Sequence, residues 1–479
     1  PGEVQITVEM LKSGSQPILD ALAVLYNKCL QEGKISKQWK NAEVILLFKK
    51  GDILNLENYR PISLLSHFYK LFSRIISNRL TSKLDFYQPV EQAGFRKGFS
   101  TIEHLQTVRS LIEKCTEYNV PLHMAFVDYH KAFDSVEKWA FLTALEDARI
   151  DSRYIALIKD IYEESTLHVR ITDDIITDKV KVNKGVRQGD PISPKIFTLA
   201  LEKVFKSVSW DDMGVNIDGS KLRELRFADD VFSASNVLNE LRIMLEELKE
   251  ASEAVGLQMN LEKTKVMTSD DNPVTVSGHV LENVAEYVYL GHGMRKGKSN
   301  QSAEIGRRIG LTWAAFGKLK PILTNASIPI SLKRKVYNQC LLPVTTYGLE
   351  TMALTEKSAD RLRVMQRAIE RSMLGISLRD KIRNEEIRRR TGIKDIMERI
   401  AELKWNWVGH VARMNPERWT YKVTNWRPRQ TTRSQGRPQK RWIDDVTKIA
   451  GKGWQRTAQS REEWSNLREA FVQQWTVKS

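Results

Sequence analysis

Two adjacent aspartates, Asp229 and Asp230, stand inside the otherwise apolar stretch LRFADDVFSA, residues 225–234. The chain holds five Asp-Asp pairs, and the other four lie in polar or mixed surroundings that are typical of solvated turns. A carboxylate that leaves water is costly unless a cation or a hydrogen-bond donor compensates it. Apolar residues on both sides of the pair favour a strand, a tight turn and a second strand. Taken alone, the pattern fits a plain β-hairpin with an acidic tip equally well.

A third aspartate, Asp128, ends another apolar strand, MAFVD. If this strand and the hairpin at 229–230 are neighbours in one sheet, three carboxylates meet at its edge. Such a cluster repels itself unless cations occupy it, and hard oxygen ligands suit Mg²⁺, which accepts substrate phosphates as further ligands. Two such ions about 4 Å apart can activate a 3′-hydroxyl and stabilise the leaving pyrophosphate. The three aspartates therefore predict nucleotidyl transfer.

The elements that must position these aspartates can be read from the spacing of apolar residues. Residues 39–52 predict a strand that runs into a Lys-Lys-Gly-Asp turn, and residues 121–136 predict a strand followed by a helix. Helical spacing predicts helices over 62–84, 101–117 and 194–208. Strands and helices that mix without strict alternation favour the α+β class.

Length, charge and cysteine content limit the class of protein. A chain of 479 residues predicts about three or four subdomains. Residues 1–300 hold 39 Lys and Arg against 42 Asp and Glu, whereas residues 301–479 hold 36 against 17. A basic second half favours a polyanion such as nucleic acid as the partner. The three dispersed cysteines offer neither a disulfide framework nor a Cys-x-x-Cys zinc spacing, and no apolar run approaches the length of a membrane span.

Seven motifs occur in an order and spacing that resemble the reverse transcriptases of non-LTR (LINE-type) retrotransposons. Two resemble the finger region of that family: KKGDILNLENYRPISLLSHFYKLFSRIISNRL and QAGFRKGFST. Five resemble its palm: AFVDYHKAFDSV, GVRQGDPISPKIFTLAL, RFADDVFS, GLQMNLEKTKVM and YVYLGHGM. The tail, with WNWVGHVARM and RPQKRWIDDV, looks most like the RTE/BovB-type branch.

The resemblance implies an α+β right-hand polymerase fold with a basic C-terminal extension. It places the fingers at 1–122, the palm at 123–290 with finger insertions at about 150–185, the helical thumb at 291–375 and a basic, Trp-rich nucleic-acid-binding region at 376–479. Eight of the twelve Trp follow residue 400. We expect most of them to form a small core, although Trp can also stack on unpaired bases. The tail lacks the family's Cys/His zinc knuckle, so no zinc is expected.

The resemblance also implies roles for single residues. Asp128 and Asp229 match the principal metal ligands, and Asp230 completes the acidic cluster. Phe133 matches the bulky residue that excludes a ribose 2′-hydroxyl, and packing in the core is the alternative role for its ring.

Further residues match positions that hold the substrates. Lys50 and Arg60 match the finger cations that bind the triphosphate, where a bidentate guanidinium suits phosphate oxygens. Lys263 matches a lysine that protonates pyrophosphate, with Lys265 as the competing choice. The other matches are Gln188 and Gly189 for template and incoming nucleotide, Arg96 for template or nucleotide, and Tyr289, Leu290 and Gly291 for the primer-grip hairpin.

These matches predict an RNA-directed DNA polymerase that extends a DNA 3′ end with two Mg²⁺ ions, or Mn²⁺, as in target-primed reverse transcription. The expected partners are an RNA template, a DNA primer or target and dNTPs, with no membrane. We expect action in the nucleus after cytoplasmic assembly with the RNA. No endonuclease-like segment or ribonuclease H-like acidic set matches, so neither activity is expected of this chain. The alternatives are a catalytically silent scaffold and a maturase-like RNA-binding protein.

Overall fold

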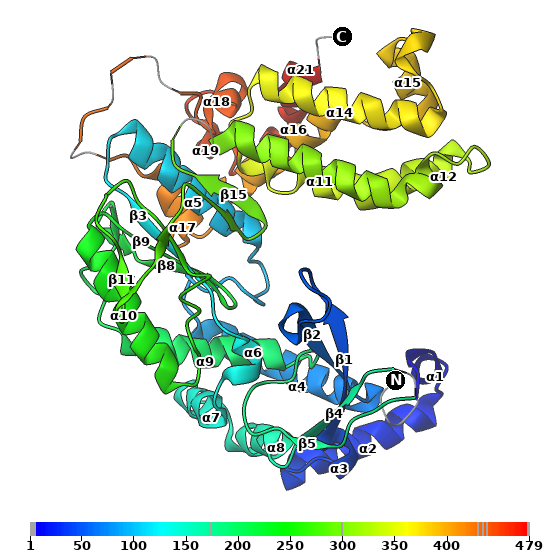
Figure 1. The fold of residues 1–479 in the computed structure, drawn as a ribbon, viewed down its shortest axis with the longest axis vertical. Helices are drawn as coiled ribbons and strands as arrows, with labels where there is room; N and C mark the ends of the chain where they lie inside the picture. Colours follow the sequence, from blue (N-terminus) through cyan, green and yellow to red (C-terminus); the bar gives the residue numbers. More distant parts are fainter. Residues whose placement is uncertain are drawn as a thin grey trace.

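The computed structural model describes residues 6–172, 174–297, 300–428, 431–433, 435–436 and 439–476. Its ribbon curves into an open arch, with helix α2 (Gln16–Glu32) at one end, helix α21 (Arg468–Thr476) at the other and the strands β3, β8 and β9 between them (Figure 1). Within these ranges no helix combines the length and apolar character needed to cross a membrane.

The sheet nearest α2 has the strand order β2-β1-β4-β5. Strand β1 (Asn41–Phe48) pairs antiparallel with β2 (Tyr59–Leu64) and parallel with β4 (Thr166–Arg170), and β5 (Val180–Lys181) pairs with β4. A strand from residues 166–170 thus joins two strands from residues 41–64. The helices of this part are α1 (Val8–Lys12), α2, α3 (Lys37–Lys40) and α8 (Ser152–Tyr162).

The helix predicted over residues 62–84 is α4 (His67–Tyr87), so its predicted start was wrong. Ile62 lies opposite Ile45 in the ladder between β1 and β2, and residues 62–64 therefore belong to a strand. The error arose because apolar spacing within one segment carries no information about a partner strand far away in the sequence.

The central sheet has the order β13-β10-β3-β9-β8. Strand β3 (His123–Val127) lies in the middle and pairs antiparallel with β9 (Asp230–Ser235) and with β10 (Lys265–Met267). Strand β8 (Glu224–Phe227) pairs with β9, and β13 (Glu282–Asn283) runs parallel to β10. All five residues of β3 are buried, which explains why residues 124–127 are apolar without alternation.

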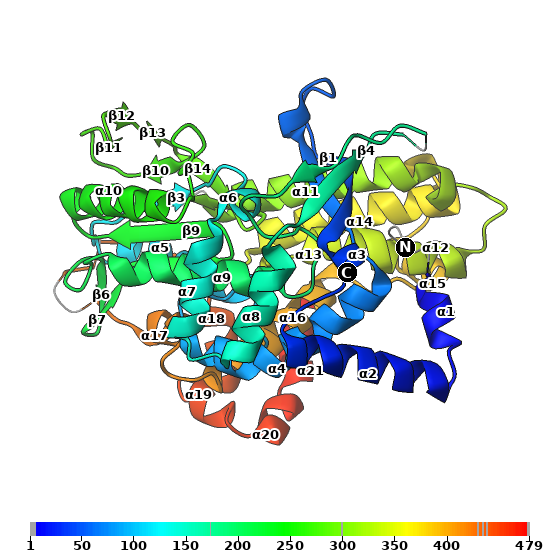
Figure 2. The ribbon, with the colours of Figure 1, turned by 90° about the horizontal axis from the view of Figure 1, so that it is seen from below.

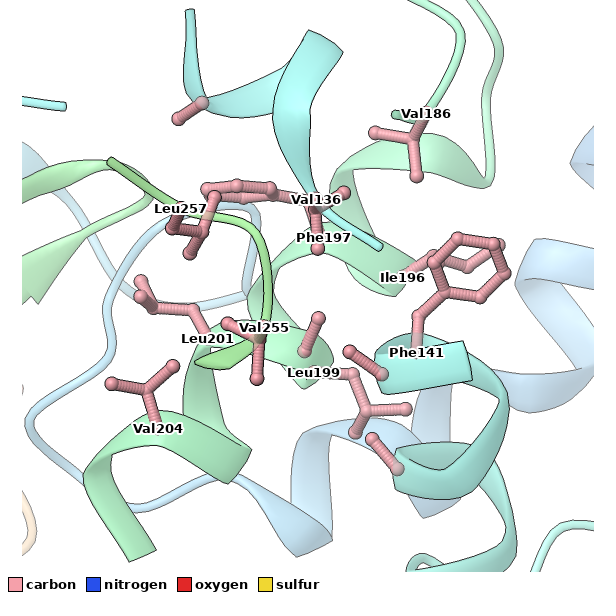
Figure 3. Packing of buried hydrophobic residues seen from close by; sticks show 14 of the residues in the cluster. Val136, Phe141, Val186, Ile196, Phe197, Leu199, Leu201, Val204, Val255 and Leu257 are labelled. Carbon is pink, nitrogen blue, oxygen red and sulfur yellow. The ribbon is translucent and has the colours of Figure 1, made fainter. Parts of the chain in front are cut away.

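Different helices cover the two faces of this sheet. Ala125 and Val127 belong to a core with helices α9 (Ser193–Ser207) and α10 (Leu238–Ala254), whereas the intervening Met124 and Phe126 belong to a core with α5 (Thr101–Glu117). Figure 2 shows β9 between α10 and α5. In the first core, Phe197 and Leu199 of α9 pack near Phe141 of α7 (Lys138–Asp147) and near Val255 and Leu257 (Figure 3). The sheet is therefore held rigidly from both sides.

The hairpin of β14 (Glu286–Tyr289) and β15 (His292–Arg295) follows the central sheet and leads into the long helix α11 (Asn300–Leu323). The remaining strands form the short pairs β6 (Val215–Ile217) with β7 (Ser220–Leu222) and β11 (Thr275–Val276) with β12 (His279–Val280). The later helices are α12 (Ile330–Val336), α13 (Leu342–Thr346), α14 (Glu356–Leu374), α15 (Asn384–Thr391), α16 (Ile396–Ala412), α17 (Trp419–Asn425), α18 (Asp444–Ala450), α19 (Trp454–Thr457) and α20 (Arg461–Asn466).

One hydrophobic core extends from α11 to α21. Trp405 is 1% exposed, and its ring stacks on Trp464 with ring centroids 3.9 Å apart. Seven of the eight Trp after residue 400 are buried. Five of them belong to this core, which confirms the predicted packing role for most of the eight, whereas Trp419 and Trp426 are buried in the separate core with α5 and the central sheet. Residues 291–375 and residues 376–479 contribute to the same core, which joins α14, α16 and α21 into one body.

The C-terminal region also contacts α5, the helix that covers one face of the central sheet. Lys114, near the end of α5, donates hydrogen bonds to the carbonyl groups of Val423 and Thr424 at 2.7 and 2.8 Å. Arg418 pairs with Glu103 of α5 at 3.0 Å. These contacts tie α17 to the helix that supports β3.

The charge of Glu113 on α5 gives a test of this packing. Burial raises the pKa of Glu113 to about 7, although its carboxylate accepts a hydrogen bond from the Trp442 backbone N–H. A carboxyl pKa that is higher in the folded chain lowers stability as the pH rises from about 4.5 to 7. Above pH 7 we therefore expect Glu113→Gln to raise the thermal midpoint by roughly 2–4 °C, which corresponds to about 1 kcal/mol in the free energy of unfolding. Near pH 4.5 the substitution should have little effect.

Scanning calorimetry across this pH range measures the difference, with Glu385→Gln on the exposed face of α15 as the control. A pH-independent difference between Glu113→Gln and the unmodified chain would contradict the expectation.

Candidate active site

The central sheet brings Asp128, Asp229 and Asp230 to one end. Asp128 follows β3 directly, Asp229 lies in the turn between β8 and β9, and Asp230 begins β9. Val127 is opposite Val231 in the antiparallel ladder, so the next residue along β3, Asp128, comes beside Asp230. The predicted convergence of the strand end and the hairpin is therefore present in the structure.

The turn that carries Asp229 is tight. Phe227 pairs with Asp230, which leaves Ala228 and Asp229 as a two-residue loop, and Ala228 has a positive φ of 59°. The side chain of Gln92 supports this turn, because its Oε1 accepts hydrogen bonds from the N–H groups of Ala228 at 3.1 Å and Gly94 at 2.8 Å. Residues 91–94 thus lie along the edge of β8, where Ala93 N–H donates to the Arg226 carbonyl.

Desolvation raises the pKa of all three carboxyl groups. For Asp230, desolvation and the charges of Asp229 and Asp128 raise the pKa to about 6. In the described part of the chain no other side chain donates a hydrogen bond to these carboxylates. Like charges placed together in this way raise one another's pKa values, and nearby cations can offset the rise.

Three cationic side chains reach the aspartates electrostatically. The charges of Lys263 and Lys49 offset part of the rise in the pKa of Asp128, and those of Lys49 and Arg60 offset part of the rise in the pKa of Asp229. Desolvation is the main cause that lowers the pKa of Lys49, followed by the charges of Arg60 and Lys263. These residues come from the end of β1, from β2 and from the segment before β10, so two sheets contribute to one site.

The charges of two of the three predicted cations, Arg60 and Lys263, act on the aspartates, and Lys49, the neighbour of the third, acts on them as well. Arg60 and Lys263 act on the aspartates, whereas Lys265 pairs with Glu282 at 2.5 Å. The residue whose charge reaches the aspartates from the end of β1 is Lys49, which the motif comparison did not select. Lys50 is exposed, and its contact with a triphosphate stays a prediction.

The aspartates fit Mg²⁺ chemically. Carboxylate oxygens are hard ligands, and Mg²⁺ is usually held by one or two carboxylates while waters and substrate phosphates complete its shell. Among the described residues no group of three or more His, Cys, Asp or Glu side chains is arranged so that it could hold a metal ion by itself. The aspartates thus supply the ligand type that Mg²⁺ prefers, and water and substrate phosphates would have to complete its shell.

Phe133 lies on α6 (Ala132–Ser135), five residues after Asp128. Its ring stacks on Phe197 with centroids 4.4 Å apart and meets Phe95 edge-on at 6.2 Å. The side chain is half-buried, so one face packs on the core while part of the ring stays accessible.

The loop with Gln188 and Gly189 is held from both sides by buried charged residues. The Asp190 carboxylate, 2% exposed, accepts hydrogen bonds from Ser73 and, at 2.5 Å, from Tyr69. Arg187 is also buried and donates to the carbonyl groups of three residues, Trp39, Lys40 and Ile161. Sequence reasoning missed Arg187 and Asp190, although a charged pair inside the motif RQGDP was the available signal.

The contacts of Gln188 and Gly189 explain their residue types. Gly189 has a φ of 107°, and a Cβ there would lie 2.9 Å from the Ser63 carbonyl oxygen, so glycine lets this loop approach β2. The Gln188 amide donates to both oxygens of Asp134 at 2.9 and 3.1 Å. Asp134 is therefore a further residue of this region that the motif comparison did not single out.

The Arg96 side chain forms hydrogen bonds within its own loop. Its guanidinium donates hydrogen bonds to the carbonyl groups of Gln92 and Asp85, both at 2.8 Å, and of Pro89. These three bonds close the loop that carries Gln92 to the catalytic hairpin. The predicted contact of Arg96 with template or nucleotide stays a prediction.

The hairpin with Tyr289, Leu290 and Gly291 lies against the central sheet. Tyr289 is buried, and Leu290 and Gly291 form the turn with φ values of 44° and 73°. Tyr287 stacks on Phe126 of β3 with centroids 4.3 Å apart. Burial, helped by the charges of Asp128 and Asp230, raises the Tyr287 pKa to about 12. The hairpin therefore belongs to the neighbourhood of the three aspartates.

Gly94 offers a test of the support under the catalytic turn. A Cβ on residue 94 would lie 2.3 Å from the backbone nitrogen of Ala228, so Gly94→Ala must displace the turn. We expect hydrogen–deuterium exchange of residues 226–232 to accelerate at least tenfold while exchange in α14 stays unchanged. Gly453→Ala, where a Cβ would meet nothing within 4 Å, is the control. Equal exchange of residues 226–232 in the two variants would count against this role of Gly94.

Comparison with known proteins agrees with this geometry. The family described as "Reverse transcriptase (RNA-dependent DNA polymerase)" matches residues 48–294. A putative uncharacterized transposon-derived protein of Caenorhabditis elegans is 32% identical over 270 residues, which cover 52% of this chain and 96% of that protein.

Two longer relatives are identical to this chain at about a quarter of the aligned positions. The probable RNA-directed DNA polymerase from transposon BS of Drosophila melanogaster is 26% identical over 72% of this chain and 39% of its own length. The Pol polyprotein from type-1 retrotransposable element R2 of Popillia japonica is 26% identical over 70% of this chain and 48% of its own. The chain thus spans less than half the length of these two relatives. The family match, together with the strand end and hairpin that unite the aspartates, shows that the chain has the α+β right-hand polymerase fold and belongs to the reverse transcriptase (RNA-dependent DNA polymerase) family.

Proposed function

We propose that this chain is the polymerase of a non-LTR retrotransposon, which extends a DNA 3′ end on an RNA template by two-metal nucleotidyl transfer. The observation that carries the proposal is the meeting of Asp128 with Asp229 and Asp230 beside Lys49, Arg60 and Lys263. Phosphoryl transfer needs little covalent chemistry from a protein and depends on positioning and on charge. Carboxylates for metal ions next to cations for a triphosphate supply both.

The carboxylates and the cations have complementary tasks. Asp128 and Asp229 would hold Mg²⁺, which when bound supplies activation of the primer 3′-hydroxyl and neutralises charge on the leaving pyrophosphate. Arg60 suits bidentate contact with phosphate oxygens, and Lys49 or Lys50 adds a second positive charge. Lys263, whose charge reaches Asp128, would give a proton to the pyrophosphate. Asp230 completes the acidic end of the sheet.

Two further residues would select the substrate. The accessible part of the Phe133 ring would lie under the sugar of the incoming nucleotide and leave no room for a 2′-hydroxyl. Gln188, oriented by Asp134, would support the incoming nucleotide and the template. Phe133 and Asp134 follow Asp128 within six residues, which supports these assignments.

The biological setting is proposed from the relatives and from the tail motifs. Relatives named for transposons and for a type-1 retrotransposable element support a retrotransposon enzyme. The motifs WNWVGHVARM and RPQKRWIDDV favour the RTE/BovB-type branch. In this setting the RNA of the element is the template, a nicked chromosomal DNA end is the primer, and synthesis takes place in the nucleus.

Replacing a metal ligand tests the reaction. We expect Asp229→Asn to reduce primer extension on an RNA template with Mg²⁺ by at least a thousandfold, because the neutral amide binds a cation poorly. Extension is measured by gel with a labelled DNA primer and dNTPs. Asp211→Asn, an exposed acidic position elsewhere in the chain, is the control. If Asp229→Asn extended primers as fast as the control, the proposed metal role would be lost.

Sugar selection is tested at Phe133. We expect Phe133→Ala to lower the preference for dNTPs over rNTPs at least tenfold, measured as the ratio of their kcat/KM values. Phe133→Tyr keeps the ring and its stacking on Phe197, so it should retain the preference. An unchanged ratio in Phe133→Ala would leave only the packing role for this ring.

A further inference from the structure

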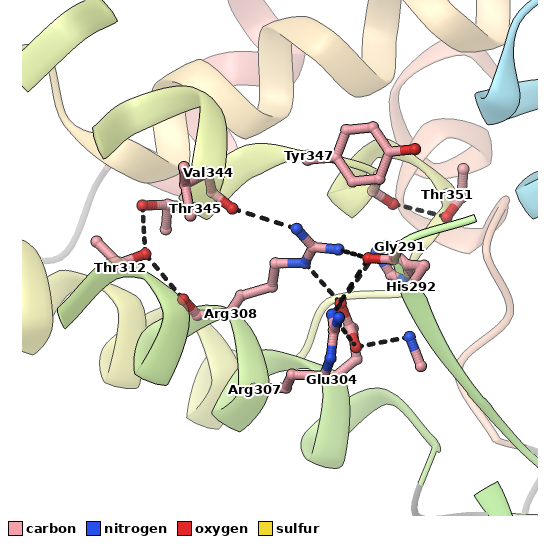
Figure 4. Close-up of polar contacts among 12 residues, drawn as sticks. Gly291, His292, Glu304, Arg307, Arg308, Thr312, Val344, Thr345, Tyr347 and Thr351 are labelled. Carbon is pink, nitrogen blue, oxygen red and sulfur yellow. Dashed lines mark hydrogen bonds and ion pairs between the residues drawn. The ribbon is translucent and has the colours of Figure 1, made fainter. Parts of the chain in front are cut away.

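A polar cluster joins the β14–β15 hairpin to helix α11 and to the segment after α13 (Figure 4). Arg109 of α5 also belongs to this cluster. We call it the hairpin joint and define it by its polar side chains: Arg109, His292, Glu304, Arg307, Arg308 and Tyr347. His292 and Glu304 are 0% exposed, and Arg109 and Arg308 are 6% and 4% exposed. Side chains from α5, from the hairpin, from α11 and from the segment after α13 therefore meet in one largely buried site, with the half-buried Arg307 and Tyr347 at its edge.

The side chains of the joint hold the turn of the hairpin by its backbone. The carbonyl oxygen of Gly291 accepts hydrogen bonds from Arg308 and, at 3.2 Å, from Arg307. The carbonyl oxygen of Leu290 accepts one from the Tyr347 hydroxyl at 2.9 Å. Both central residues of the turn are thus fixed from α11 and from residue 347, and not from within the hairpin.

Glu304 is the acceptor that unites the joint. Its Oε2 accepts a hydrogen bond from the Gly293 N–H at 2.8 Å, and its Oε1 accepts one from Arg308 Nε at 2.6 Å. Arg308 in turn donates to the Val344 carbonyl at 3.3 Å, so one guanidinium links the hairpin turn, α11 and α13. Glu304 and Arg308 therefore fix the turn at two backbone groups, together with the hydrogen bonds from Arg307, Tyr347 and Arg109.

His292 and Arg109 close the joint from the side of α5. Arg109 Nη2 lies 2.6 Å from His292 Nδ1 and donates to the Gly293 carbonyl at 3.0 Å. A guanidinium can only donate, so Nδ1 is the accepting nitrogen and the proton is on Nε2, which lies 3.5 Å from Glu304 Oε1. Burial, with the charges of the three arginines, keeps the pKa of His292 far below its usual value, so the ring stays neutral.

Stability alone does not account for so many buried charges. Removing charged groups from water costs several kcal/mol per ion, and well-packed apolar residues of similar volume are often at least as stable. Three guanidinium groups against the carboxylate of Glu304 also leave the joint positively charged. What the charged network supplies is a fixed position of the hairpin turn and a positive field beside it, which suits a polyanion.

The position of the turn matters because the hairpin lies beside the three aspartates. Tyr287 of β14 stacks on Phe126 of β3, and the Asp128 and Asp230 charges act on it. A displacement of the turn would therefore also displace the end of a nucleic acid strand that is bound between the hairpin and the aspartates.

We propose that Glu304 and Arg308 are positioning residues that set the primer 3′ terminus through the backbone of Leu290, Gly291 and Gly293. The inference rests on the proposed polymerase function and adds residues to it. Neither side chain would touch the reacting atoms. Because a misplacement of about 1 Å can lower a reaction rate a hundredfold, loosening the turn should slow chemistry more than it weakens binding.

The test compares Arg308→Lys with Arg367→Lys. Both arginines are buried and pair with a glutamate about one helical turn away, Glu304 in the first case and Glu370 in the second. In the part of the chain that the structure describes, Arg367 and Glu370 make no hydrogen bond or ion pair with the hairpin. The two variants should therefore lose similar stability, while only Arg308→Lys removes the Arg308 hydrogen bond to the Gly291 carbonyl and leaves the one from Arg307.

Three quantities are measured: the rate of first-nucleotide addition in single turnover, the KM for dNTP, and the dissociation constant for a DNA primer on an RNA template. The temperature is about 15 °C, below the thermal midpoints of both variants. We expect Arg308→Lys to lower the single-turnover rate ten- to a hundredfold, with less than a threefold change in the other two constants. Arg367→Lys should leave all three within threefold. Equal single-turnover rates in the two variants would overturn the inference.

Tyr347→Phe keeps the proposal testable if Arg308→Lys does not fold. This change removes one hydroxyl, which donates to the Leu290 carbonyl and lies 2.9 Å from the Thr101 hydroxyl, and leaves the ring in place. We expect a three- to tenfold lower single-turnover rate, and an unchanged rate would also overturn the inference. If the unmodified chain extended no primer at all, the proposed function would fail instead, so the two failures are distinguishable.

Discussion

The register between β3 and β9 is the constraint on which the rest of the structure depends. It sets Val127 opposite Val231 and so brings Asp128 beside Asp230, although about a hundred residues separate them. A shift by one residue would turn every side chain of a strand to the other face. Here both faces are covered by apolar cores, so packing on α5, α9 and α10 selects one register and with it the meeting of the carboxylates.

The surrounding elements resist the repulsion that this meeting creates. Desolvation and mutual charge raise the pKa values of the aspartates, and cations from a separate sheet offset part of that effect. Gln92 holds the turn that carries Asp229, and the Asp190 carboxylate, bound by Tyr69 and Ser73, holds the loop of Gln188. The charged arrangement of the site is thus held by hydrogen bonds of Gln92, Tyr69 and Ser73, which are neutral side chains.

Buried polar groups occur where separate segments of the chain must keep one relative position. The hairpin joint links α5, the β14–β15 hairpin and α11, and Lys114 with Arg418 links α5 to α17. Apolar contacts alone could stabilise these junctions but would tolerate sliding, whereas a hydrogen bond to a charged group is directional. Helix α5 takes part in both junctions, so it connects the central sheet with the helical C-terminal part.

The sequence by itself determined the chemistry of the site, because residue types and motif spacing identify carboxylates after apolar strands. Motif positions alone are enough to select Asp128, Asp229, Asp230, Arg60 and Lys263. Only the tertiary structure decided that the charge of Lys49, next to the predicted Lys50, acts on the aspartates. It also decided where helix α4 begins and which residues hold the turn that carries Asp229. Contacts such as Gln92 with Ala228 and Glu304 with Gly293 act through backbone groups, which every residue type carries, so residue identity gives no sign of them.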